Sequence, residues 1–186
     1  MTRRRLRPRY TPDELARIYA RPHDHSLWDD HKIRVGVTIE VCRWVLRRAE
    51  VRTAADLSCG DAAIIRALGV DRMILGDYAP GYDHHGPIEA TIEEIPPVDL
   101  FVCSETIEHL DDPEAVLARI REKTSHLVVS TPLDAFHDVN PEHYWAWDRQ
   151  GVEAMLTAAG FQVDVFCPVD TRPAGLYYQF GIWAAR

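Results

Sequence analysis

The stretch Ala54–Leu68 constrains the fold most, because it joins an apolar strand to a helix through a very short turn. It reads A-A-D-L-S-C-G-D-A-A-I-I-R-A-L, with Ser58, Cys59 and Gly60 in the turn. Gly60 can adopt a positive φ without steric cost, as a tight turn requires. Doubly wound α/β proteins bind their ligands where a strand turns into a helix at the carboxyl edge of a parallel sheet. The sequence therefore predicts an α/β fold with a ligand site at this turn.

Length and composition favour one folded domain. The chain has 186 residues, 46% of them hydrophobic, which suits one domain with a core and is too short for two. Its formal net charge of -8 argues against a general affinity for nucleic acid. No apolar run approaches the ~20 residues of a membrane span, and no secretory signal is recognisable. We therefore expect a cytoplasmic protein without a membrane partner, with its four cysteines reduced.

Residues 1–29 are predicted to form an N-terminal arm or lid before a single domain at residues 30–186. Arginines cluster at positions 3, 4, 5, 7 and 9; we interpret them as a solvated, frayed tail, with a phosphate-contacting arm as the alternative. Thr11, followed by proline, is typical of a helix start, and a longer helix is expected from about Asp30 to Ala49. Three histidines between them indicate a polar lid, with metal binding as the alternative: His23, His25 and His31.

A second strand, Arg72–Asp77, ends in a carboxylate seventeen positions after Gly60. Doubly wound folds place an acid at about this distance against a ribose diol, and a carboxylate can accept hydrogen bonds from both hydroxyls. The segment 78–87 contains two glycines and two prolines, which predicts a loop with the usual crossover helix lost or very short. A brief strand or turn is expected at Ile88–Ile92.

The rest of the chain alternates apolar runs with capped helices. Strands are expected at 98–105, 126–132, 161–167 and 177–184. Helices are expected to begin at Asp112 and at Asp148, the second ending at Gly160. The alternation implies a mostly parallel sheet with helices on both faces. Because no helix separates the last two strands, one strand near an edge should be antiparallel.

Two stretches carry a family resemblance. D-L-S-C-G-D-A resembles the first motif of the class I S-adenosylmethionine (SAM) dependent methyltransferases, typically D-x-G-x-G-x-G, and D-L-F-V-C-S-E-T-I-E-H-L-D-D-P is similar to their fourth motif. S-T-P and A-A-G-F follow in the same order. The resemblance implies a Rossmann-like sheet of seven mostly parallel strands, the last inserted antiparallel, and SAM as cofactor. A nicotinamide-dinucleotide site is disfavoured, because that site requires G-x-G-x-x-G.

The resemblance also implies roles for individual residues. Asp77 should grip the ribose, Thr91 and Ile92 should read the adenine edge, and Ser104 and Glu105 should face the methionine half. The predicted cofactor-binding residues are Asp56, Ser58, Cys59, Gly60, Asp77, Tyr78, Thr91, Ile92 and Ser104.

Methyl transfer from a sulfonium mainly requires an acceptor held about 3 Å from the methyl and, where needed, a base. Histidine is the natural base at neutral pH, so His109 and His143 are candidate catalytic residues together with Glu105. A structural, hydrogen-bonded role is the alternative for both histidines. Aromatic residues in the same region predict an acceptor pocket, with a hydrophobic cluster under the loop as the alternative: Phe136, Tyr144, Trp145 and Trp147.

We expect a methyltransferase acting on an oxygen or nitrogen nucleophile of a small molecule. One alternative is a metal-dependent 2′-O-methyltransferase of RNA ends, because Glu105-x-x-Glu108-His109 with His143 resembles the metal set of those enzymes. The low basicity of the chain makes nucleic acid the less favoured partner. A SAM-binding protein without catalytic activity is the other alternative.

Overall fold

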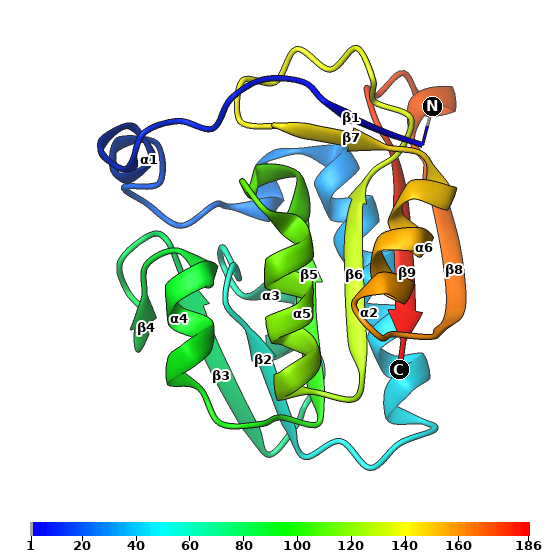
Figure 1. The fold of residues 1–186 in the computed structure, drawn as a ribbon. Coiled ribbons are helices and arrows are strands. Elements are labelled where there is room, and N and C mark those ends of the chain that lie inside the picture. Colours follow the sequence, from blue (N-terminus) through cyan, green and yellow to red (C-terminus); the bar gives the residue numbers. More distant parts are fainter. Residues whose placement is uncertain (1) are drawn as a thin grey trace.

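The computed structural model describes residues 2–186, with the backbone alone for His25. Its centre is a seven-stranded sheet in the order β4-β3-β2-β5-β6-β9-β8 (Figure 1). The last strand, β9, pairs antiparallel with both β6 and β8, whereas the other neighbours pair parallel. The predicted sheet is confirmed. Its strands are β2 (Thr53–Asp56), β3 (Arg72–Asp77), β4 (His84–His85), β5 (Leu100–Ser104), β6 (Leu127–Pro132), β8 (Val163–Asp170) and β9 (Gln179–Ala185).

Helices cover both faces of the sheet. One face carries α4 (Ile88–Glu94), α5 (Pro113–Lys123) and α6 (Arg149–Ala158), and the other carries α2 (Asp29–Leu46) and α3 (Ala63–Arg66) (Figure 1).

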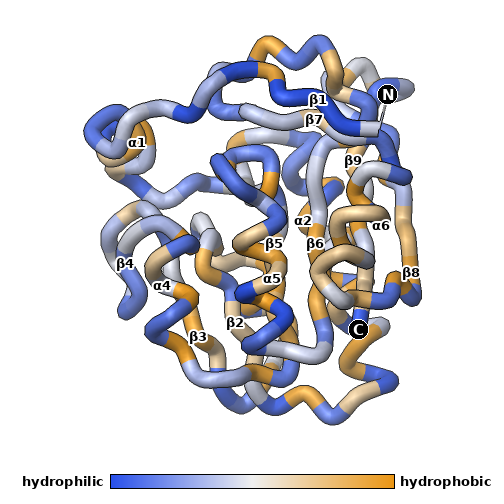
Figure 2. The backbone as a smooth tube through the Cα atoms, viewed as in Figure 1, coloured by the Kyte–Doolittle hydropathy of each residue, from blue (hydrophilic) through white to orange (hydrophobic). Residues whose placement is uncertain are grey.

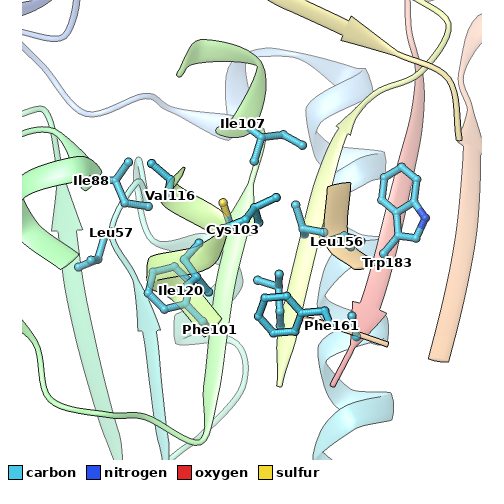
Figure 3. Close-up of a cluster of buried hydrophobic side chains, with 14 of the residues drawn as sticks. Leu57, Ile88, Phe101, Cys103, Ile107, Val116, Ile120, Leu156, Phe161 and Trp183 are labelled. Carbon is cyan, nitrogen blue, oxygen red and sulfur yellow. The ribbon is translucent and has the colours of Figure 1, made fainter. Parts of the chain in front are cut away.

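The side chains of successive β5 residues point to opposite faces of the sheet, as strand geometry requires. Phe101 and Cys103 belong to the cluster beneath α4, α5 and α6 (Figure 3), whereas Leu100 and Val102 pack beneath α2 and α3. Hydrophobic residues follow the strands in Figure 2, and the N-terminal segment is hydrophilic.

The predicted helix starts at Asp112 and Asp148 are confirmed by their caps. The side chain of Asp112 accepts a hydrogen bond from the amide of Ala115, and that of Asp148 accepts one from Gly151. Each cap satisfies an amide that has no partner within its helix. The helix start predicted at Thr11 is also confirmed, and the structure adds a capping box there, at the start of α1 (Pro12–Ile18).

The structure corrects the expectation for Ile88–Ile92. This segment is neither a strand nor a turn but belongs to α4, which begins after Pro87 and supplies a crossover helix before β5. Ile88, Ile92 and Ile95 follow at spacings of four and three, and all three are buried in the core. That spacing places them on one face of a helix, so the apolar period rather than the preceding loop decides the structure. Within the predicted loop, β4 pairs with the end of β3.

The arginine-rich start is not a frayed tail. Residues Arg3–Arg5 form β1, which pairs antiparallel with β7 (Trp145–Trp147) (Figure 1). Arg3 forms an ion pair with Glu114 and lies over the Trp145 ring, 3.9 Å from its centroid. Acidic and aromatic partners of β7 and α5 therefore hold the cluster in place.

Beyond β1, the chain crosses the upper edge of the sheet to α1 and to the short helix η1 (His25–Leu27) before entering α2 (Figure 1). Gly151 permits the close approach at the start of this arm, because a Cβ there would collide with the carbonyl of Thr2. None of the helices formed by residues 2–186 is both long and apolar enough to cross a bilayer.

Candidate active site

A cavity of about 260 Å³ lies between the sheet edge and the N-terminal arm. Its walls include the turn after β2, the end of β3, the end of β5 and the loop before β7. The arm contributes Leu15 and Tyr19 to the walls, which sequence patterns did not single out. Eight of the predicted site residues line the cavity: Ser58, Gly60, Asp77, Tyr78, Ser104, Glu105, His109 and His143.

The turn after β2 and the end of β3 are joined through the carboxylate of Asp77. Gly60, with φ of 55°, donates its amide to Asp77 Oδ2 at 2.7 Å, and Ala79 donates to Oδ1 at 2.8 Å. Asp77 is 8% exposed, so these two amides fix its position at the cavity wall. Because each carboxylate oxygen can accept more than one hydrogen bond, both retain capacity toward a ligand.

Asp56 and Cys59 lie behind the turn rather than in the cavity wall. Asp56 is buried and accepts a hydrogen bond from the amide of Ser58 at 3.1 Å. Burial raises the pKa of Asp56 to about 7, against the lowering effect of that amide. Burial likewise raises the pKa of the Cys59 thiol. Both residues therefore shape the turn from within.

Thr91 and Ile92 do not line the cavity. Both are buried in α4, where Thr91 Oγ1 donates to the Pro87 carbonyl at 3.3 Å and Ile92 joins the core. The cavity wall is instead formed one turn earlier, by residues 86–89. Because residues 88–92 form a helix and not the expected strand or turn, the first turn of α4 lies at the cavity while Thr91 and Ile92 lie in the core.

A buried arginine reaches the cavity from α2. Arg34 has no exposed surface and donates through Nη1 to Ser104 Oγ at 2.6 Å. Its Nε and Nη2 are buried without a hydrogen-bond partner, and Nε lies 4.0 Å from Glu105 Oε2, too far for a hydrogen bond. Only its burial reveals a cation with unused donors at the site.

The residue that follows β5 is held in an unusual backbone conformation. Glu105 has φ of 52°, which is uncommon outside glycine and carries a steric cost. Ser130 of the neighbouring strand compensates, since its carbonyl accepts the Glu105 amide at 2.9 Å and its hydroxyl donates to Glu105 Oε1 at 2.9 Å. The Glu105 carboxylate is therefore aimed by β6.

Glu108, His109 and His143 bring one potential metal-ligand atom each within 4.8 Å of one another. Glu108 Oε2 accepts a hydrogen bond from Thr131 at 3.0 Å, whereas Oε1 is buried without such a partner and lies 3.9 Å from His109 Nε2. Burial, with the charge of Glu105 second, raises the pKa of Glu108 well above its usual range. Burial and the neighbouring His143 lower the pKa of His109.

The three histidines near the arm do not form such a group among the described side chains. His23 and His31 contact each other, with 3.1 Å between His23 Nε2 and His31 Nδ1, and both line the cavity. The side chain of His25 lies outside the described part of the chain.

The aromatic loop is a packing cluster rather than an acceptor pocket. None of Phe136, Tyr144, Trp145 and Trp147 lines the cavity. Tyr144 and Trp147 are fully buried, and Trp145 stacks on Trp147 at a centroid distance of 6.2 Å beneath β1. The predicted alternative, a hydrophobic cluster, is confirmed for Trp145 and Trp147, which belong to the core beneath α4, α5 and α6.

Solved methyltransferases share this architecture. The structure superposes on a 1,6-didemethyltoxoflavin-N1-methyltransferase of Burkholderia thailandensis with a TM-score of 0.64 and 16% identity, covering 97% of this chain and 92% of that one. It superposes on the magnesium protoporphyrin IX methyltransferase of Synechocystis PCC 6803 with a TM-score of 0.62 and 13% identity, covering 93% and 92%. Both were crystallised with S-adenosylhomocysteine (SAH). The chain has the class I SAM-dependent methyltransferase fold, and SAM is the cofactor of this class.

The chain is also similar in sequence to a curated methyltransferase. It is 26% identical over 180 residues to a small RNA 2′-O-methyltransferase of Mus musculus, a match that covers 72% of this chain. The match covers 45% of the relative, so the chain spans about half the length of that protein. No family model matches the chain.

Proposed function

We propose that the protein transfers the methyl group of SAM to the 2′-hydroxyl of a 3′-terminal ribose of RNA, with a divalent cation held beside the cofactor. The observation that carries this proposal is the cluster of Glu108, His109 and His143, whose two histidines line the same cavity as Asp77 while Glu108 is buried beside them. The expected small-molecule acceptor becomes the second candidate.

The cavity residues fit SAM at both of its ends. SAM supplies an electrophilic methyl group on a sulfonium, with a ribose diol at one end and an amino-acid carboxylate at the other. The fixed carboxylate of Asp77 suits the diol, and the unused Nε and Nη2 of the buried Arg34 suit an anion. Residues 86–89 line the cavity and are the candidates for the adenine contact that the sequence predicted for Thr91 and Ile92. Ser58 and Ser104 complete the wall between them.

The donor set also fits a divalent cation. Glu108 Oε1 is a buried acceptor without a hydrogen-bond partner, which costs free energy unless a ligand satisfies it. One carboxylate and two imidazoles suit Mn²⁺, Co²⁺ or Zn²⁺, and a second carboxylate, from Glu105, extends the set toward Mg²⁺. A bound divalent cation lowers the pKa of a hydroxyl that it contacts and orients the acceptor oxygen.

Three considerations support a terminal ribose as the methyl acceptor. A terminal ribose presents adjacent 2′- and 3′-hydroxyls, which together can occupy two positions on one cation. The net charge of -8 argues against binding along a nucleic-acid backbone, whereas recognition of a single terminal nucleotide needs few phosphate contacts. The similarity to a small RNA 2′-O-methyltransferase supports the same acceptor.

The second candidate is transfer to a small molecule without a metal. His109 favours it, because its lowered pKa keeps the imidazole neutral and able to accept a proton at neutral pH. The ring centroid of His143 lies 4.8 Å from that of His109, so His143 would be the second candidate base.

The test measures methyl transfer from labelled SAM to a short single-stranded RNA with a 3′-terminal diol. We expect transfer to stop after treatment with EDTA and to return with Mg²⁺, Mn²⁺ or Co²⁺. RNA ending in a 2′-deoxynucleotide is the matched control and should accept no methyl group. Transfer to small molecules that ignores the chelator would favour the second candidate, and SAM binding without any transfer would indicate a non-catalytic protein.

A further inference from the structure

His143 is held by a carboxylate that sequence patterns did not single out. Its Nδ1 lies 2.7 Å from Asp138 Oδ2, and both side chains are nearly buried, with 7% and 5% of the residue surface exposed. The two residues belong to the loop between β6 and β7 and are five positions apart. A hydrogen bond of this length in a buried place restricts the rotation of the imidazole ring.

The neighbouring Asn140 determines which ring nitrogen carries the proton. Asn140 Oδ1 accepts the amide of Glu142 at 3.0 Å, so the other amide atom is Nδ2, a donor. This Nδ2 lies 3.1 Å from His143 Nε2, which must therefore be the acceptor. The proton then resides on Nδ1 and is donated to Asp138. Both contacts select the same tautomer, with the lone pair on Nε2.

Asp138 itself is fixed by its surroundings. Its Oδ1 accepts hydrogen bonds from the amide of Asn140 at 2.8 Å and from the hydroxyl of Tyr178 at 3.2 Å. The guanidinium of Arg7, from the N-terminal arm, donates to the main-chain carbonyls of Asp138 and Asn140. Asn140 and Tyr178, the latter just before β9, therefore hold the carboxylate of Asp138, while the arm holds the backbone that carries it.

We propose that Asp138 is a positioning residue, which holds His143 in the Nδ1-protonated form so that Nε2 is the atom available to the Glu108 and His109 group. The inference rests on the proposed function, in which that group holds a divalent cation. Metal-ligating histidines are commonly oriented by a carboxylate on their other nitrogen, and the contact from Asn140 is the one that a cation would displace.

The experiment compares Asp138→Ala and the isosteric Asp138→Asn with wild type. We measure Mn²⁺ affinity of the SAH complex by electron paramagnetic resonance, SAH affinity by calorimetry, and the His143 tautomer by two-bond ¹H–¹⁵N spectra without metal. Asp134→Asn is the matched control, because Asp134 lies in the same loop and is exposed.

We expect Asp138→Ala to lower Mn²⁺ affinity about 10–100-fold and to leave SAH affinity unchanged. The His143 ring should lose its single Nδ1-protonated form. Asp138→Asn keeps an acceptor oxygen, so its Mn²⁺ affinity should lie between those of Asp138→Ala and wild type. The control should match wild type throughout.

The proposal is overturned if wild type shows the Nε2-protonated form, or if both Asp138 variants keep wild-type Mn²⁺ affinity and the same tautomer. If wild type binds no Mn²⁺, the proposed cation role fails, and the ring spectra alone then decide whether Asp138 positions His143. Should Asp138→Ala not fold, Asp138→Asn and the wild-type spectra carry the same decision.

Discussion

The two halves of the cavity are built in different ways. At the ends of β2 and β3, main-chain amides of Gly60 and Ala79 hold one carboxylate, that of Asp77. At the ends of β5 and β6, side chains hold side chains: Ser130 holds Glu105, and Thr131 holds Glu108. The first half depends on a local turn, whereas the second depends on residues brought together from separate strands and loops.

Because of this difference, substitutions in the two halves should affect different properties. A substitution in the first half should weaken cofactor binding, because that half has a single anchoring carboxylate. A substitution at Glu108, His109 or His143 in the second half should impair transfer while cofactor binding persists, because these groups are proposed to act on the acceptor. Variants that change both properties together would break the distinction.

The largest effect is expected for Glu108→Gln. The neutral amide keeps the shape but removes a charged ligand, so methyl transfer should fall at least about 100-fold. SAH affinity should stay within about a factor of two. Kinetics and calorimetry check both values, with Glu122→Gln on the exposed side of α5 as the control. A parallel loss of SAH affinity would contradict the separation of the two halves.

Asp77→Ala should act on the other half. Loss of charge-assisted hydrogen bonds to the ribose should weaken SAH binding by ~1.5–3 kcal/mol. Isothermal calorimetry measures this loss against Asp83→Ala, a change in the exposed loop that follows. Unchanged affinity would mean that the ribose lies elsewhere.

Arg34→Met sharpens the comparison at the boundary between the halves. The variant keeps a long apolar side chain and removes the cation, so SAH should bind about 2 kcal/mol more weakly. Binding of 5′-methylthioadenosine, which lacks the amino-acid carboxylate, should not change. Equal losses for both ligands would show that Arg34 supports the site only as the buried partner of Ser104 and Glu105.

The smallest effect concerns stability. The pKa of Asp56 is raised to about 7, so between about pH 4 and 7 the folded state binds a proton that the unfolded chain has released. Stability from this group is therefore present at acid pH and is lost as the pH rises toward 7. Asp56→Asn should remove that slope and be more stable at pH 7 by about 1–2 kcal/mol. Denaturant unfolding at pH 5 and 7 measures the free energy of unfolding of both proteins. The same change with pH in wild type and in Asp56→Asn would contradict the prediction.

Local patterns predicted much of the fold. The strand that ends at Asp77, the caps at Asp112 and Asp148 and the antiparallel last strand all follow from short-range features. The turn at Gly60 likewise lies within one continuous motif. These elements were predictable because turn chemistry, capping and apolar period act over a few residues.

Two of the misplaced features, the arginine-rich start and Arg34, depend on distant partners. The arginines of β1 are ordered by Trp145, Glu114 and Asp111, each more than a hundred positions away. Arg34 is buried because it meets Ser104 on another element. No local pattern contains such information, so charge near the start of the chain suggested a solvated tail.

The most direct test is a crystal of the SAH complex soaked with Mn²⁺ and measured for anomalous scattering. We predict SAH with its ribose at Asp77 and a manganese peak within bonding distance of Glu108, His109 and His143. SAH bound at Asp77 with no manganese peak at that cluster would rule out a cation held by these three residues.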